Sequence, residues 1–439
     1  MDTSTNNHIT TAELAKPFGL DINKIRKDFP MLDHTTNGKK LIYFDSAATN
    51  HKPKQVIEKI NTLYTKEYGK PQEEHELSKT MQAELENSRN KIAAFLQATE
   101  SKQIIFTSGC TEGINIVAQG FGKAILKKGD EIMITALEHH ANISPWHIAC
   151  EMSGAKLVII PVDNDGIPDL KEFDKLISKK TRIISIAHTS HVLGTVLPVA
   201  EIIKVAHMHD IPVLVDAAQS APHMPINVHQ MDCDFLTFSA HKMGGPAGVG
   251  VLYGKIDWLN KIPPHNAGTE NTKTVTYEKT TYESLPRKFE AGTTAFEEIV
   301  ALGELVDYVT DLDMEKTSEY EKSLLRYLTQ KLSEVPRVRL YGLAAEKEPV
   351  LSFAVDGVDI KTLEKYLSDE HNISVRAGEL SAQPLMKMLN VPGLLRASLC
   401  YYNTVEEIDS FVDAVKSFIH IIEKVQEKVD MGGTFTENN

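Results

Sequence analysis

The stretch DFLTFSAHKMGGPAGVGVLYG, residues 234–254, places a lysine between two apolar runs. The first run leads into Ser239, His241 and Lys242, and the second follows a cluster of glycines. Short runs rich in branched and aromatic residues are typical of buried β-strands. The lysine therefore follows a predicted strand directly, and ligands of open α/β sheets bind beyond such strand ends.

Five similar runs precede this stretch, and helical segments separate them. They are QIIFTSG (103–109), DEIMITALEH (130–139), KLVIIPV (156–162), TRIISIAHTS (181–190) and IPVLVDAA (211–218). With DFLTFSAHK and GVGVLYG they predict an α/β fold with a mostly parallel seven-stranded sheet, covered by helices on both faces.

The pattern of the chain predicts four parts. A large α/β domain spans residues 41–295. From residue 296 to 425 longer helices alternate with a few strands, which predicts a smaller α+β domain that also takes in the N-terminal segment. Residues 1–40 are expected to be partly flexible, and residues 426–439 to form a flexible tail.

Composition and charge exclude several classes of protein. The chain has 439 residues and a net charge of -13, without a Lys/Arg-rich run, so a nucleic-acid partner is not expected. Its four cysteines show no CxxC spacing, which argues against a disulfide framework or a metal site. No apolar stretch has the length of a signal core or a membrane span, so we expect a cytoplasmic protein without membrane contact.

Polar residues follow four of the predicted strands at their carboxyl ends. Small residues that open a helix after the first strand present backbone N–H groups suited to a phosphate. A desolvated lysine can lose its proton and bond a carbonyl carbon. The residues in question are Gly109, Cys110 and Thr111, then His139, then Asp216 and Gln219, and finally Ser239, His241 and Lys242.

Each of these signals alone also fits an ordinary structural role. The first is compatible with a capped turn, His139 with a partly buried histidine, Asp216 with a helix N-cap, and Lys242 with a surface loop. Together they match what pyridoxal 5'-phosphate (PLP) requires, which is a phosphate cradle, an aromatic ring, a carboxylate for the pyridinium and an imine-forming lysine. We therefore expect PLP as the cofactor.

The motifs resemble those of the class V aminotransferase family, and within it the group II cysteine desulfurases and selenocysteine lyases. The resemblance extends from about residue 40 to 420. It rests on FDSAAT, SGCTEGIN, EHHANISPW, VLGT, VDAAQSAPH, FSAHKMGGPAGVGVLYG, FEAGT, VRAG, AQPLM and RASLCYYNT. It implies PLP fold type I, an enzyme that is a lyase or a transferase, and a homodimer.

The resemblance also implies a role for individual residues. Lys242 carries the aldimine and moves protons, Asp216 pairs with the pyridine nitrogen, and His139 stacks on the ring. The other implied cofactor-binding residues are Gly109, Cys110, Thr111, His191, Gln219, Ser239 and His241, with Thr293 reaching the cofactor of the neighbouring subunit. Arg396 is implied to bind the substrate carboxylate, and Arg376 and Ser381 to line the substrate side.

The substrate-facing positions depart from the family pattern. Ser381 stands where the desulfurases carry their catalytic cysteine, and a serine hydroxyl cannot hold a persulfide. His191 replaces the usual asparagine before VLGT, and Glu379-Leu380 replaces two histidines. The acids Glu74, Glu76 and Glu270 add carboxylates near the expected site. The cofactor-holding residues match the family while the substrate-facing residues differ.

This combination predicts a PLP enzyme that acts on a small amino acid through a Cα carbanion. Our first hypothesis is a lyase that eliminates a β-substituent, such as sulfur from cysteine, without a persulfide-forming cysteine. An epimerase or aminotransferase of a biosynthetic pathway is the alternative within enzymes. A third hypothesis is a catalytically inactive, desulfurase-like partner protein. A sulfur-acceptor protein as partner is left open.

Overall fold

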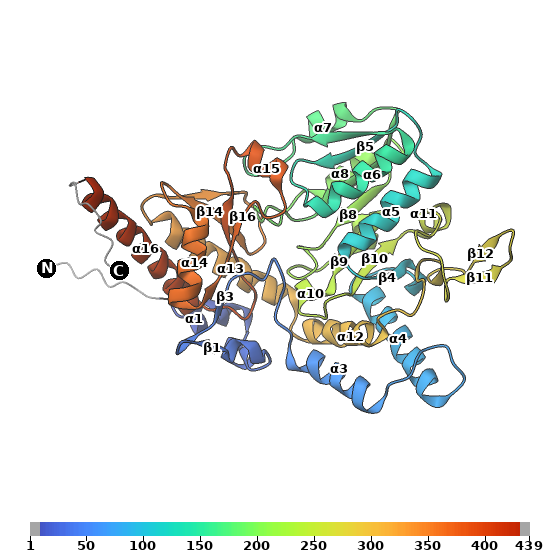
Figure 1. Ribbon diagram of the computed structural model, residues 1–439, viewed down its shortest axis with the longest axis horizontal. Helices are drawn as coiled ribbons and strands as arrows, with labels where there is room; N and C mark the ends of the chain where they lie inside the picture. Colours follow the sequence, from blue (N-terminus) through green and yellow to red (C-terminus); the bar gives the residue numbers. More distant parts are fainter. Residues whose placement is uncertain (1–8, 431–439) are drawn as a thin grey trace, which may run out of the picture.

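The computed structural model describes residues 9–430 of the chain, and Figure 1 shows a large sheet-containing part beside a smaller part. The predicted seven-stranded sheet is confirmed, and its strands coincide with the seven apolar runs. In spatial order they are β4 (Ile104–Thr107), β10 (Gly250–Gly254), β9 (Phe235–Ser239), β8 (Val213–Asp216), β7 (Thr181–Ala187), β5 (Glu131–Thr135) and β6 (Lys156–Ile160).

The sheet is mixed in direction, with β10 as its antiparallel member. β10 pairs antiparallel with both β4 and β9, and the remaining pairs are parallel. β4 therefore runs in the same direction as β9, and six strands point their carboxyl ends to one edge. This arrangement brings the polar residues that follow β4, β5, β7, β8 and β9 to the same edge of the sheet.

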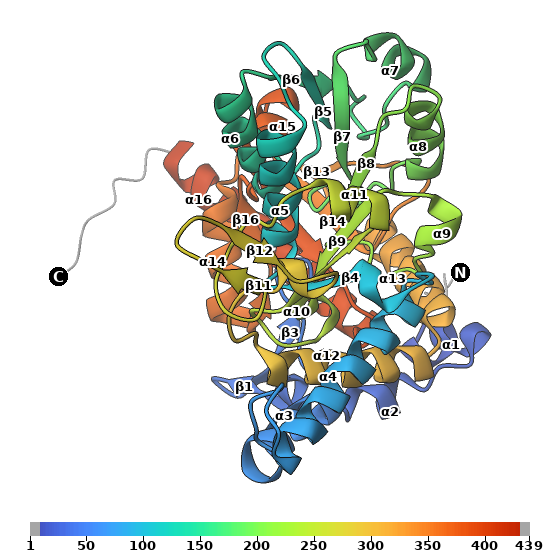
Figure 2. The same ribbon diagram turned by 90° about the vertical axis from the view of Figure 1, so that its right-hand side faces the viewer.

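Alternate side chains of the strands enter two hydrophobic cores. On one face Ile132 and Leu214 pack with Phe121, Trp146 and Leu259 from the covering helices. The strand side chains on the other face, such as Met133 and Val213, belong to the main core. Figure 2 shows helices along both faces. The helices of this part are α3 (Lys54–Lys66), α4 (Glu76–Phe95), α5 (Cys110–Ala124), α6 (Ser144–Ser153), α7 (Leu170–Leu176), α8 (Val199–His207), α9 (Val228–Met231), α10 (Ala240–Met243) and α11 (Ile256–Lys261).

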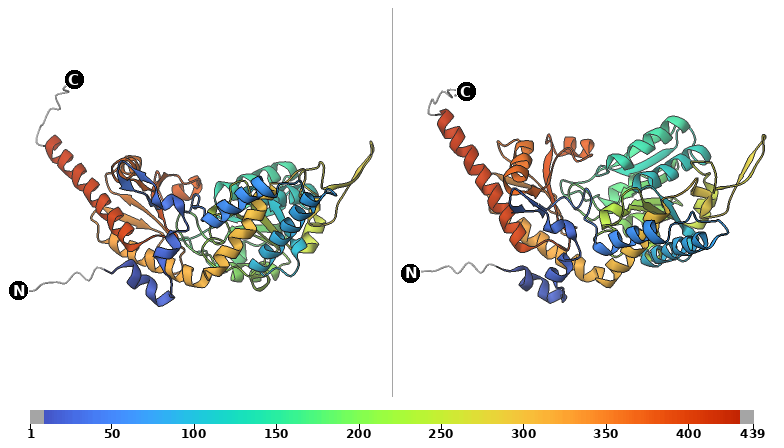
Figure 3. Two further views of the ribbon diagram at one scale, coloured as in Figure 1. Left: turned by 90° about the horizontal axis from the view of Figure 1, so that it is seen from below. Right: turned by 60° about the horizontal axis from the view of Figure 1, so that its bottom comes forward.

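The second part contains an antiparallel sheet in the order β13 (Val338–Tyr341), β14 (Val350–Val355), β17 (Leu394–Ser398) and β16 (Arg376–Gly378). Helix α12 (Phe296–Asp311) packs on α3 and α4 of the large part. The other helices are α13 (Met314–Ser333), α14 (Ile360–His371), α15 (Gln383–Met388) and α16 (Val405–Asp430). A hairpin of β11 (Thr272–Val275) and β12 (Thr280–Tyr282) projects from the opposite end of the molecule (Figures 1 and 3).

The N-terminal segment packs on the second part. β3 (Ile42–Tyr43) pairs parallel with β15 (Ile373–Ser374), and the Arg26 guanidinium lies 2.8 Å from the Glu407 carboxylate on α16. Figure 3 shows this segment beside the last helix. It contains α1 (Thr11–Ala15), α2 (Ile22–Arg26) and the two-stranded pair β1 (Thr35–Thr36) and β2 (Lys39–Lys40).

The predicted flexibility of the two ends needs correction. Within the segment 1–40, residues 9–40 form the elements just named, and a capping box on Thr10 fixes the start of α1. Helix α16 continues to Asp430 and so enters the predicted tail 426–439. The rest of both predictions, residues 1–8 and 431–439, lies outside the described residues. Along the described part of the chain, no helix combines the length and the apolar composition needed to cross a membrane.

Candidate active site

A cavity of 240 Å³ lies at the carboxyl edge of the large sheet, between the two parts of the molecule. It collects side chains from five strand ends and from the second part. Of the residues that the sequence singled out, its lining includes Cys110, Thr111, His139, His191, Asp216, Gln219, Ser239, His241, Lys242, Arg376, Ser381 and Arg396. Residues up to 286 positions apart therefore meet in one place.

Lys242 lies in the short helix α10, directly after β9. No hydrogen bond or ion pair within residues 9–430 engages its amine, although it lines the cavity. Burial lowers the pKa of Lys242, and the nearby Asp216 carboxylate only partly offsets this. An amine with a lowered pKa loses its proton more readily, and the neutral amine is the form that bonds a carbonyl carbon.

Asp216 ends β8 and is buried at the floor of the cavity. Its Oδ1 atom accepts the Ala218 N–H at 2.9 Å and the Cys110 thiol at 3.2 Å. Both of these contacts use the same oxygen, so Oδ2 remains to accept a proton donor in the cavity. Burial and Asp216 hold the pKa of the Cys110 thiol well above its usual value, and this thiol therefore stays protonated.

The first turn of α5 contributes Cys110 and Thr111 to the cavity lining. Gly109 caps this helix at a φ of 152°, and the Ser239 hydroxyl accepts the Cys110 N–H at 2.8 Å. A Cβ atom on Gly109 would come within 3.2 Å of the same hydroxyl, so the turn needs glycine. The N–H groups in the first turn of a helix have no partner inside it and favour an anion.

His139 and Gln219 complete the cavity wall. The His139 Nδ1 atom accepts the Ala141 N–H at 3.0 Å, so the ring carries its proton on Nε2. Burial and Lys242 lower the pKa of His139 to about 4, which leaves a neutral flat ring at pH 7. The Gln219 amide donates to the Ala47 carbonyl at 2.8 Å, and its buried Oε1 finds no hydrogen-bond partner within the described chain.

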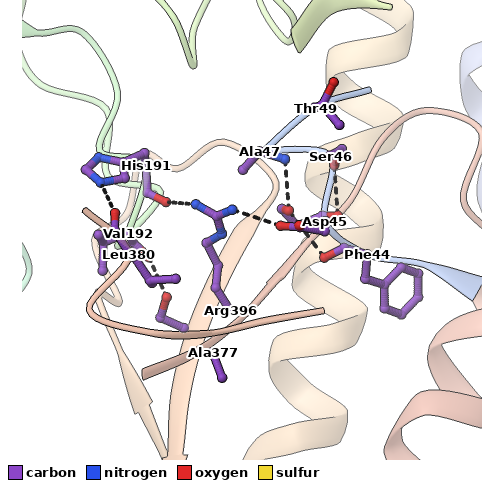
Figure 4. Close-up of polar contacts among 12 residues, drawn as sticks. Phe44, Asp45, Ser46, Ala47, Thr49, His191, Val192, Ala377, Leu380 and Arg396 are labelled. Atoms are coloured by element: carbon purple, nitrogen blue, oxygen red, sulfur yellow. Dashed lines mark hydrogen bonds and ion pairs between the residues drawn. The ribbon is translucent and has the colours of Figure 1, made fainter. Parts of the chain in front are cut away.

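Arg396 enters from β17 and is buried, with 3% of its side chain exposed. Its Nη2 atom lies 2.9 Å from Asp45 Oδ1, and its Nη1 atom donates to the His191 carbonyl oxygen at 2.9 Å (Figure 4). Its Nε atom is buried and has no hydrogen-bond partner among residues 9–430. Arg396 thus keeps a buried, unpaired donor, and its side chain lines the cavity together with the exposed Arg376.

Ser381 lies in a tight turn of residues 379–383, which we call the Ser381 turn. Leu380 and Ser381 have left-handed backbone angles, with φ of 54° and 56°. The Leu380 side chain is buried, and the Ala382 N–H donates to the Glu379 carbonyl at 2.9 Å. Figure 4 shows the Leu380 carbonyl facing the ring of His191. The turn therefore presents Ser381 to the cavity from a packed position.

Other predicted residues lie elsewhere. Thr293 lines a second cavity, of 170 Å³, which also contains Glu270. The lining of the Lys242 cavity includes none of the acids Glu74, Glu76, Glu270 and Glu379. Glu270 pairs with Lys70 at 3.0 Å and with Arg287 at 3.4 Å, while Glu379 accepts the Gln383 amide at 2.7 Å. Gly109 shapes the turn without lining the cavity itself.

Sequence reasoning missed two residues of this site. Asp45 pairs with Arg396 across 351 positions, and Thr189 lines the cavity with a buried hydroxyl that lacks a partner within the described residues. Asp45 had a signal, because it follows the apolar run LIYF in the same way as Asp216 follows its own strand.

Comparison with known proteins identifies the relatives of the chain. The family described as aminotransferase class-V matches residues 42–411. A cysteine desulfurase from Enterobacter sp. is 43% identical over 403 residues, which are 91% of this chain and 99% of the relative. A cysteine desulfurase from Synechococcus elongatus is 40% identical over 417 residues, 95% of this chain, but this chain spans only 66% of its length.

Solved structures agree with these matches. The crystal structure of a cysteine desulfurase from Escherichia coli has a TM-score of 0.85 and 34% identity, covering 92% of this chain and 99% of the other. A mutant of the protein C-DES, whose PLP cofactor carries covalently linked glycine, has a TM-score of 0.77 and 25% identity, covering 89% of this chain and 98% of the other.

Proposed function

The chain belongs to the class-V aminotransferase family, and from this premise we propose that it removes a β-substituent from a small amino acid without a protein thiol. The sequence prediction of a PLP-dependent, cysteine desulfurase-like enzyme is confirmed at the level of the family. The reaction, the substrate and the residue roles below are our proposal.

The cavity fits PLP on several independent observations. The Lys242 amine has no protein partner within residues 9–430, Asp216 keeps one oxygen for a pyridinium proton, and the buried Gln219 Oε1 lacks a partner. The first turn of α5 and the Ser239 hydroxyl suit a phosphate. When bound, PLP supplies an electron sink that stabilises negative charge at the substrate Cα.

Three residues of the cavity would bind the cofactor and transfer protons. Lys242 would hold the cofactor through Nζ and would take the proton from the substrate Cα. Asp216, a buried carboxylate, would keep the pyridine nitrogen protonated. The neutral His139 ring offers a flat surface for stacking.

Arg396 binds and orients the substrate carboxylate. Its free Nε atom is a donor for that carboxylate, and a buried guanidinium holds an anion more strongly than an exposed one. Arg376 is exposed at the mouth of the cavity and adds positive charge there. The site therefore favours amino acids with a free α-carboxylate and a small side chain.

The hydroxyl at position 381 is the main support for a mechanism without a persulfide step. The family resemblance aligns Ser381 with the catalytic cysteine, and the Ser381 turn contains no thiol. Cys110 is the cysteine in the cavity lining, and its raised pKa keeps it protonated. Elimination breaks the bond from Cβ to its substituent, which leaves with the electron pair, so no thiol is needed. With one molecule of water, cysteine would then give sulfide, pyruvate and ammonia.

Mass spectrometry of the PLP-loaded protein after incubation with L-cysteine and a thiol-reactive alkylator tests this proposal. We expect sulfide and pyruvate in solution and no persulfide on any peptide. The matched variant Ser381→Cys should gain a persulfide at position 381 and form alanine. A persulfidated wild-type peptide would contradict the proposal, and a changed Cα configuration or a keto acid with the substituent retained would favour the epimerase or aminotransferase.

A homodimer is the second part of the proposal. Thr293 lies outside the Lys242 cavity of its own chain, in the second cavity, which supports a role toward the cofactor of a neighbouring subunit. We expect analytical ultracentrifugation of the wild type to show a dimer. We expect the Thr293→Val variant to bind PLP more weakly than the wild type. A monomer that binds PLP as tightly would contradict this part.

A further inference from the structure

The Ser381 turn has a backbone that its own sequence does not favour. Leu380 and Ser381 adopt left-handed φ angles in succession, a conformation that residues with side chains visit mainly one at a time. Such a conformation persists where surrounding contacts impose it. The contacts that impose it therefore decide where Ser381 stands in the cavity.

Two histidines from the large part make these contacts. The His191 Nε2 atom lies 2.8 Å from the Leu380 carbonyl oxygen. The His140 N–H donates to the Ser381 carbonyl at 3.0 Å, and the Gln383 N–H donates to His140 Nε2 at 3.2 Å. The polar contacts of this turn to the large part thus pass through His191 and His140.

The contact of His191 Nε2 with the Leu380 carbonyl oxygen shows which ring nitrogen carries the proton. A carbonyl oxygen only accepts, so His191 carries a proton on Nε2. Burial, His139 and Arg396 hold the pKa of His191 well below its usual value, so the ring is neutral. The His139 ring meets it edge-on, with 4.8 Å between centroids and an interplanar angle of 70°. The ring is therefore fixed by a donor bond on one side and an aromatic contact on another.

The same residue also holds Arg396. The His191 carbonyl oxygen accepts the Arg396 Nη1 proton at 2.9 Å, while its ring reaches Leu380 (Figure 4). A shift of residue 191 would therefore move the guanidinium and the Ser381 turn together. An asparagine side chain at this position is shorter and could not bring a donor as far toward Leu380.

We propose that His191 is a positioning residue that fixes the Ser381 turn against Arg396, so that the hydroxyl and the carboxylate-binding group keep one relative placement. The effect on substrate rests on the proposed function, whereas the effect on the turn does not. His191 acts here through its neighbours and needs no contact with the reacting atoms.

Hydrogen–deuterium exchange of the PLP-loaded protein tests the effect on the turn. His191→Asn should accelerate exchange of the peptide 379–389 about tenfold, because the buried Leu380 carbonyl loses its donor. His191→Gln is the matched control, since its amide nitrogen replaces Nε2, and its exchange should stay within about threefold of the wild type. The peptide 181–187 of β7 should not change.

Two results of this experiment would overturn the proposal. One is unchanged exchange of 379–389 in His191→Asn, and the other is an equal acceleration in 181–187, which would indicate general loosening. If His191→Asn does not fold, NMR of the wild type labelled with ¹⁵N-histidine decides. A neutral ring with its proton on Nε2 supports the proposal, and a proton on Nδ1 alone contradicts it.

Kinetics with L-cysteine test the link to Arg396. His191→Asn should raise the KM about tenfold with a smaller change in kcat, and His191→Gln should restore it. An unchanged KM would refute the link. If the wild type binds PLP but does not process cysteine, the proposed function fails, while the exchange experiment still decides the role of His191.

Discussion

Replacing Arg396 with alanine removes the group that we assign to the substrate carboxylate. Arg396 is buried, its Nη2 and Nη1 atoms are engaged by Asp45 and His191, and its Nε atom is free. The substrate carboxylate thus has the free Nε donor and must share the Nη2 edge with Asp45. Because Asp45 competes for the guanidinium, the substrate carboxylate gains less binding free energy from Arg396 than it would from an arginine without such a partner.

The magnitude follows from these contacts. Hydrogen bonds to charged groups contribute about 1.5–3 kcal/mol each, and a shared second bond brings the loss to about 2–4 kcal/mol. At 1.4 kcal/mol for each factor of ten, Arg396→Ala should raise the KM for L-cysteine about 30-fold to 1,000-fold. The change in kcat should be smaller, because the carboxylate lies away from the bond that breaks.

The assay measures pyruvate release against cysteine concentration, with the PLP absorbance as a check that the cofactor is retained. Cysteamine, which lacks the carboxylate, should bind wild type and Arg396→Ala equally. Asp45→Asn is the matched control, since it removes the competing charge and should leave the KM unchanged or lower. A KM for Arg396→Ala within about threefold of the wild type would refute the assignment and place the carboxylate elsewhere.

Two further predictions concern other charged residues. Arg376→Ala should raise the KM only about threefold to tenfold, because Arg376 is exposed and water screens its charge; a larger rise than for Arg396→Ala would reverse the assignment of the two arginines. Burial raises the pKa of Glu348 to about 8, so the folded state keeps a proton that the unfolded state releases above about pH 4.5. Stability from this group is lost as pH rises, and Glu348→Gln should gain about 1 kcal/mol over the wild type per pH unit between about pH 5 and 8 in urea unfolding. Parallel pH profiles of the two proteins would contradict it.

The sheet and most of the cavity could be predicted from the sequence for one physical reason. Apolar runs identify buried strands, and the carboxyl ends of parallel strands meet at one edge. Residues directly after such runs, including Lys242, Asp216 and His139, therefore had to lie close together. The family resemblance extended this to Arg396 and Ser381, which lie on elements of the second part.

Other features depended on contacts between distant segments. The pairing of Asp45 with Arg396 arises because β3 lies beside β15 and Asp45 bridges to Ser398 of β17, and no local pattern indicates this register. The left-handed turn at Leu380 is imposed by His191 and His140 rather than by glycine. The end of α16 was missed because charged residues near a terminus resemble both a tail and an exposed helical face.

Borohydride reduction of the PLP-loaded protein, followed by digestion and mass spectrometry, tests the central claim most directly. Reduction makes the bond between an amine and the cofactor aldehyde permanent, so the modified lysine can be identified. We expect a single modified peptide, which carries the cofactor on Lys242, and we expect no modified peptide from Lys242→Ala. A cofactor on another lysine, or a wild-type protein that carries none after reconstitution, would contradict it.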